Sequence, residues 1–144
     1  MALASLFGGL ALANAGLGAV HGFAGPLGGM FGGAHGAICA RLLPHVMEVN
    51  VRALQQRLAG SPALQRYDEI ARILTGDDSA TADDGVAWAQ DLCQALQVPS
   101  LASYGMTQED LTSVVEKSSA ASSMRGNPIE LTTGELRDIL ERAL

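Results

Sequence analysis

At 144 residues the chain is long enough for one domain with a substantial core and too short for two domains of ordinary size. Charged residues make up 17% of it and apolar residues 48%, a balance that excludes an intrinsically disordered chain. The net charge of -6 and only nine scattered basic residues exclude a nucleic-acid-binding surface. The apolar excess predicts surface that faces a partner, either another domain or a second copy in a homo-oligomer.

The first forty residues contain no charged side chain and hold eleven of the seventeen glycines. A signal peptide is not indicated, because the first basic residue is Arg41 and a signal peptide needs a positive start. A membrane span is not indicated either, because the stretch is rich in glycine and interrupted by Pro26. We predict instead a helix buried on all sides, without a membrane partner. Cys39 and Cys93 lack CxxC spacing and are expected to be buried reduced thiols in a cytoplasmic protein.

No segment alternates in the manner of a strand, so an all-α helical bundle is predicted. Pro44 is expected to open or kink the third helix, because proline removes a helical hydrogen bond. The predicted helices are 3–14, 17–31, 35–43, 44–50, 52–58, 62–74, 84–96, 111–121 and 136–144.

Helix start signals follow from capping chemistry. Ser61-Pro62, Thr107 to Asp110 and Thr132 to Glu135 have the residue types and spacing of helix N-termini. Asp83 or Asp84 is predicted to cap the helix that follows, and the acid pair Asp77-Asp78 is expected to be solvated. That helix is expected to bury one apolar face, formed by Trp88, Leu92 and Leu96. A turn is predicted at Arg125 to Pro128.

Six glycines recur at alternating four- and three-residue intervals, at positions 18, 22, 25, 29, 32 and 36. On a helix this spacing would place them on one face. We interpret them as a stripe for close helix packing rather than a cradle for a ligand.

His21 and His35 are the candidate chemical residues. On an unbroken helix their separation of fourteen residues would span about 21 Å, too far for one metal ion. A break at Gly32-Gly33 would allow the next helix, which begins at His35, to fold back and bring the two imidazoles together. The residues alone leave two interpretations open, a shared metal or two hydrogen-bonded core histidines. Two ligands are also fewer than a catalytic metal usually has.

The other histidine, the cysteines and the glycine motifs do not indicate a further chemical site. His45 is expected to be a partly buried histidine bonded to backbone, and neither cysteine has a histidine at a suggestive spacing. No GxSxG motif supports nucleophilic hydrolysis, and no nucleotide-binding glycine motif is complete.

Three segments together resemble the C-terminal helical domain of iron-containing alcohol dehydrogenases. They are 12–29 (LANAGLGAVHGFAGPLGG), His35-Gly36 and 42–47 (LLPHVM). The resemblance implies the helical half of a two-domain, dehydroquinate synthase-like fold, with 1–50 as the glycine-rich metal-ligand segment and 51–144 as peripheral helices. It also implies a separate N-terminal nucleotide-binding domain, which this single helical domain of residues 1–144 lacks.

In this family His21 and His35 match two of four ligands to Fe²⁺ or Zn²⁺, while the other two ligands would precede Met1. NAD(P) would bind only with the N-terminal domain, and no catalytic residue is assigned within this chain. Gly25 stands where many members have a histidine near substrate, and Ala34 stands where a proline usually precedes the second ligand.

The resemblance implies hydride transfer between a nicotinamide cofactor and a small alcohol, aldehyde or ketone, with maleylacetate reductase-like members in the same family. We expect the 144-residue chain to be inactive alone, because it lacks two ligands and a nucleotide site. The alternative is a non-enzymatic interaction or structural module.

Overall fold

The computed structural model describes residues 2–144, and the predicted all-α fold is confirmed. No strand occurs in this range. The α-helices are α1 (Ala2–Ala15), α2 (Ala19–Phe31), α3 (His35–Arg57), α4 (Pro62–Thr75), α5 (Ala82–Ala95), α6 (Leu111–Ser119) and α7 (Thr133–Ala143). Short 3-10 helices are η1 (Leu101–Tyr104), η2 (Gln108–Asp110) and η3 (Ser122–Gly126).

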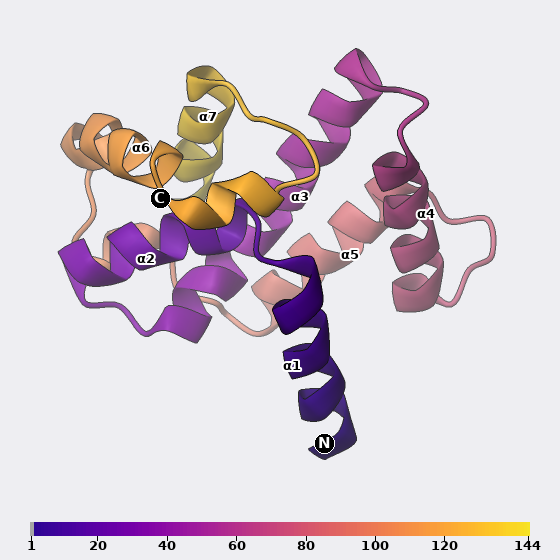
Figure 1. Cartoon of the computed structure of the whole chain (residues 1–144). Coiled ribbons are helices and arrows are strands. Elements are labelled where there is room, and N and C mark those ends of the chain that lie inside the picture. Colours follow the sequence, from indigo (N-terminus) through magenta and orange to yellow (C-terminus); the bar gives the residue numbers. More distant parts are fainter. Residues whose placement is uncertain (1) are drawn as a thin grey trace.

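Helix α3 is the central element, with α2, α7, α4 and α5 packed along it (Figure 1). Helix α6 lies against α2 and α7, and α4 pairs with α5. The main core is formed by apolar side chains of α2, α3, α6 and α7, whereas α4 and α5 share smaller clusters with the second half of α3. The helices that carry the two histidines therefore both contribute to the main core.

Pro44 does not interrupt α3. The prediction of an opening there, with a separate helix after it, is wrong, because α3 runs without a break from His35 to Arg57. Proline removes the N–H that would bond to the carbonyl of Ala40. The thiol of Cys93 on α5 donates to that Ala40 carbonyl oxygen at 3.3 Å. A neighbouring helix thus supplies a donor for the carbonyl that Pro44 leaves without its usual helical partner.

Most helix starts follow the predicted capping chemistry. Ser61 accepts from the backbone of Ala63, and Thr132 forms a capping box with Glu135. The expected start at Thr107 is also confirmed. Asp84 does not occupy the N-cap of α5, because Thr81 does, and Asp84 is its capping-box partner three residues later.

Helix α1 is exposed along its whole length, so the prediction of a helix buried on all sides is wrong. Its apolar side chains find no covering element among residues 2–144, and α1 projects from the bundle in Figure 1. No single helix in this range is long and apolar enough to cross a membrane. Taken together α1 and α2 have sufficient length and composition, but they meet at a bend of 99°.

The expected apolar face of α5 is also exposed. Trp88, Leu92 and Leu96 are 36%, 41% and 67% accessible, respectively. Helix α5 instead buries Ala82, Val86 and Ala89 against α3 and α4. The spacing i, i+4, i+8 therefore identified one apolar row of α5, while the smaller side chains form the face that packs.

Asn127, in the predicted turn after η3, ties three parts of the chain together. Its Oδ1 accepts from the backbone N–H of Ala19 at the start of α2 and from the amide of Asn50 on α3. Its own amide donates to Asn50 Oδ1 at 2.8 Å and to the Ile129 carbonyl at 2.7 Å. Asn50 is only 2% accessible, so its amide depends on these partners.

Replacement of Asn127 by alanine is expected to lower the free energy of unfolding by about 2–3 kcal/mol, because it leaves Asn50 Oδ1 and the backbone N–H of Ala19 without their partner, while the Asn50 amide nitrogen still donates to the Tyr67 hydroxyl. Urea denaturation followed by circular dichroism measures the change. Asn14→Ala is the matched control, because the Asn14 amide bonds only to Leu10 of its own exposed helix. Equal stability of the two variants would show that Asn127 does not tie these segments together.

Candidate metal centre

The chain reverses between α2 and α3 over Gly32, Gly33 and Ala34. Gly32 ends α2 with φ of 69°, a conformation that favours glycine. A Cβ at Gly33 would lie 3.0 Å from side-chain atoms of both Ile38 and Tyr104, so the second glycine gives room for close packing. Ala34 is extended and is the N-cap residue of α3. The predicted helix break at the double glycine is therefore confirmed.

Core contacts hold α2 against α3 beside this reversal. Phe23 and Leu27 on α2 and Ile38 and Leu42 on α3 are all almost fully buried in one cluster. Phe31 is only partly buried and packs at the edge of the same cluster. Packing in the core is thus the observed role of Phe23 and Leu27. These contacts fix the relative position of the two helices that carry the histidines.

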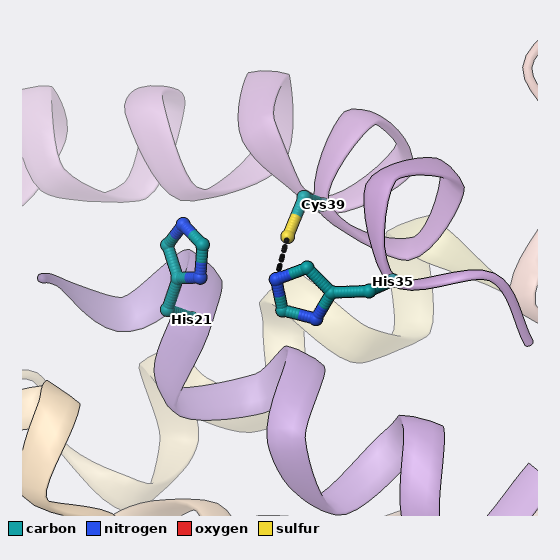
Figure 2. A group of neighbouring side chains, drawn as sticks. All are labelled: His21, His35 and Cys39. Carbon is teal, nitrogen blue, oxygen red and sulfur yellow. Dashed lines mark hydrogen bonds between the residues drawn. The ribbon is translucent and has the colours of Figure 1, made fainter. Parts of the chain in front are cut away.

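His21 and His35 lie side by side (Figure 2). His21 is in the first turn of α2 and His35 is the first residue of α3, and their ring centroids are 5.1 Å apart with planes inclined by 39°. His21 is half-buried and His35 is exposed. Within residues 2–144, no hydrogen bond involves the His21 ring, and the His35 ring has one, between its Nε2 and Cys39 Sγ. This geometry does not match two hydrogen-bonded core histidines.

Cys39 joins the two histidines, which the sequence interpretation missed. Its Sγ lies 3.6 Å from His35 Nε2, and one donor atom from each of His21, His35 and Cys39 lies within 4.8 Å of the others. The available signal was the four-residue separation of His35 and Cys39, which places two side chains on one helix face. Cys39 and Cys93 are free thiols and half-buried rather than buried. Burial raises the pKa of the Cys39 thiol.

The glycine stripe packs closely only at its start. A Cβ at Gly22 would lie 2.6 Å from Met124, and one at Gly18 would lie 3.1 Å from Asn127. A Cβ at Gly25 or Gly29 would meet no atom within 4 Å. The prediction of one continuous packing face is therefore wrong, because the α2–α3 reversal divides the series and the middle glycines face open space. At Gly25, one turn after His21, the chain presents no side chain.

His45 does not join the donor group. Its two ring nitrogens are buried without a hydrogen-bond partner in the described part of the chain, so the expected bond to backbone is absent there. Burial, followed by the charge of Arg41, lowers the pKa of His45. The predicted solvated pair Asp77-Asp78 is exposed, and Asp77 accepts a hydrogen bond from Ser79 of the same loop. Asp84 is exposed in the first turn of α5 and accepts from Thr81.

Comparison with known proteins identifies the family. The family model for "Fe-containing alcohol dehydrogenase family, C-terminal" matches residues 1–144. The chain belongs to the iron-containing alcohol dehydrogenase family. Its all-helical fold is that of the C-terminal domain, as the resemblance implied.

Individual relatives agree with this membership. Lactaldehyde reductase of Escherichia coli K12 is 31% identical over 98% of this chain and 35% of its own length. Alcohol dehydrogenase 4 of Schizosaccharomyces pombe is 32% identical over 100% of this chain and 32% of its own. A solved 1,3-propanediol oxidoreductase superposes with a TM-score of 0.84 at 27% identity, covering 98% of this chain and 36% of that one. The chain thus spans about a third of the length of these relatives.

Two alanine substitutions on α2 test where its glycines pack. Gly29→Ala is expected to raise the free energy of unfolding by about 0.5–1 kcal/mol, because alanine favours the helix and meets no neighbour. Gly22→Ala is expected to lower it by roughly 1 kcal/mol, because the new Cβ displaces Met124. Chemical denaturation of both variants measures the two changes in the free energy of unfolding. A loss of stability in Gly29→Ala would mean that this face of α2 is covered.

Proposed function

We propose that this chain is the metal-binding part of an NAD(P)-dependent alcohol dehydrogenase that transfers hydride between nicotinamide and a small alcohol, aldehyde or ketone. The observation that carries the proposal is that the ring centroids of His21 and His35 lie 5.1 Å apart in a chain of this family. The relatives' names support the substrate class, since they are a lactaldehyde reductase, an alcohol dehydrogenase and a 1,3-propanediol dehydrogenase.

The donor atoms present suit the proposed metal. Imidazole nitrogen binds Fe²⁺ and Zn²⁺ well, whereas Mg²⁺ and Ca²⁺ prefer oxygen. The family description favours iron, and zinc is the alternative that the same donors accept. When bound, the metal would supply Lewis-acid polarisation of a substrate oxygen. His21 and His35 hold their rings toward one another from two rigid helices, so little reorganisation is needed to direct nitrogens at one ion.

The rest of the reaction centre would come from outside these residues. Two imidazoles do not complete a catalytic metal site, and the sequence has no complete nucleotide-binding motif. We propose that an N-terminal nucleotide-binding domain provides the nicotinamide and the remaining ligands as the partner of this helical part. Its absence would leave the 144-residue chain inactive.

Gly25 limits what this chain can do beside the metal. Many members of the family carry a histidine at this position, but here the open space has no side chain. No group of this chain can therefore hold or pass a proton at position 25. Solvent, substrate or the proposed partner domain would occupy that space during the reaction.

Metal titration of the histidine variants tests the proposal. His21→Ala and His35→Ala are each expected to weaken binding of Fe²⁺, titrated without oxygen, and of Zn²⁺ by at least about tenfold. Bound metal is measured by mass spectrometry after gel filtration. His45→Ala is the matched control and is expected to bind as the parent does. Unchanged occupancy in the double variant His21→Ala/His35→Ala would disprove the ligand assignment.

A cofactor assay tests whether nicotinamide binding and turnover require the proposed second domain. The 144-residue chain with metal is expected to show neither tight NAD(P) binding in calorimetry nor alcohol oxidation in an absorbance assay. Tight cofactor binding together with turnover by this chain alone would contradict the proposed need for a second domain.

A further inference from the structure

Cys39 is placed to act on the same ion as the two histidines. It lies one turn after His35 on α3, and its Sγ points toward the His35 ring (Figure 2). With His21 and His35 it forms a group of three donors from two helices, all within 4.8 Å of one another. No other such group of three His, Cys, Asp or Glu donors occurs among residues 2–144. The sequence around it, residues 1–40, carries no acidic side chain that would compete for the ion.

The distance between sulfur and nitrogen fits shared coordination. Metal bonds of about 2.1 Å to nitrogen and 2.3 Å to sulfur, at a tetrahedral angle, separate the two donors by about 3.6 Å. Cys39 Sγ and His35 Nε2 are 3.6 Å apart. A hydrogen bond from the Cys39 thiol to the His35 ring nitrogen also fits a separation of 3.6 Å. That bond alone would leave the His21 ring without a partner among residues 2–144. One ion held by the three side chains would give the His21 ring a partner as well.

We propose that Cys39 is a third metal ligand, so that His21, His35 and Cys39 together bind one Zn²⁺-like cation without donors from another domain. The inference rests on the proposed function for His21 and His35 and adds the thiol to their site. Binding replaces the S–H bond of Cys39 by a bond from sulfur to the metal and releases one proton to solvent. The thiol favours Zn²⁺ or Co²⁺ over Mg²⁺ and Ca²⁺.

Three protein ligands would leave one coordination position free. This is the usual composition of catalytic zinc sites, which keep one position open for water or substrate. The exposed His35 ring and the bare backbone at Gly25 leave space on the solvent side of the group. The helical part would therefore hold its ion before a second domain packs against it.

Cobalt titration of the reduced 144-residue chain tests the role of Cys39. Bound Co²⁺ is expected to give the near-ultraviolet absorption of sulfur-to-cobalt charge transfer, with one ion per chain. Cys39→Ser and Cys39→Ala are expected to abolish this absorption and to weaken Co²⁺ and Zn²⁺ binding at least about tenfold in chelator competition. Cys93→Ser is the matched control, because Cys93 is also a half-buried free thiol and donates to the Ala40 carbonyl. It is expected to keep both the absorption and the affinity.

The outcomes separate this inference from the proposed function. If the histidine variants lose metal but both Cys39 variants bind as the parent does, Cys39 is not a ligand and only hydrogen-bonds to His35. If neither the histidine nor the cysteine variants change binding, the proposed function fails with it. Circular dichroism and thermal unfolding of each variant show whether it is folded. Retained charge-transfer absorption in a folded Cys39→Ala chain overturns the inference directly.

Discussion

The reversal of the chain between α2 and α3 is the constraint on which the candidate site depends. Without it, fourteen residues of helix would separate His21 from His35 by about 21 Å. Gly32 turns the chain through a left-handed conformation, and Gly33 lets it pass against Ile38 and Tyr104. The packing of Phe23 and Leu27 against Ile38 and Leu42 then holds the two helices in place. The glycine turn and this packing together place the ring centroids of His21 and His35 5.1 Å apart.

The rest of the fold supports this arrangement from a distance. Asn127 accepts from the first N–H of α2, so the C-terminal half of the chain fixes the helix that carries His21. Cys93 donates to the carbonyl left free by Pro44, which helps α3 to continue past a proline. Arg41 on α3 donates to the carbonyls of Ala143 and Arg142 and thus connects the same helix to the end of α7. The histidines lie on elements that are anchored at several points, as a metal site requires.

Local chemistry predicted the helices well, and tertiary contacts decided what it missed. The sequence directly indicates the capping boxes at Thr107 and Thr132 and the helix end at the double glycine, because each is formed by residues only a few positions apart. Beside Pro44, the donor to the free Ala40 carbonyl is Cys93, which lies 49 residues further along the sequence. Exposure of α1 and of Leu96 could not be inferred, because an apolar pattern does not say whether its partner belongs to the same chain. Cys39 follows His35 by four residues, a spacing that places the two side chains next to each other on a helix, but the sequence prediction did not include it.

Anomalous X-ray diffraction from crystals of the zinc-loaded chain, measured at the zinc absorption edge, tests the central claim most directly. We predict one strong anomalous peak between the rings of His21 and His35, within bonding distance of both and of Cys39 Sγ. A strongest peak elsewhere, such as beside His45 and Cys93, with no zinc between His21 and His35, would contradict the account.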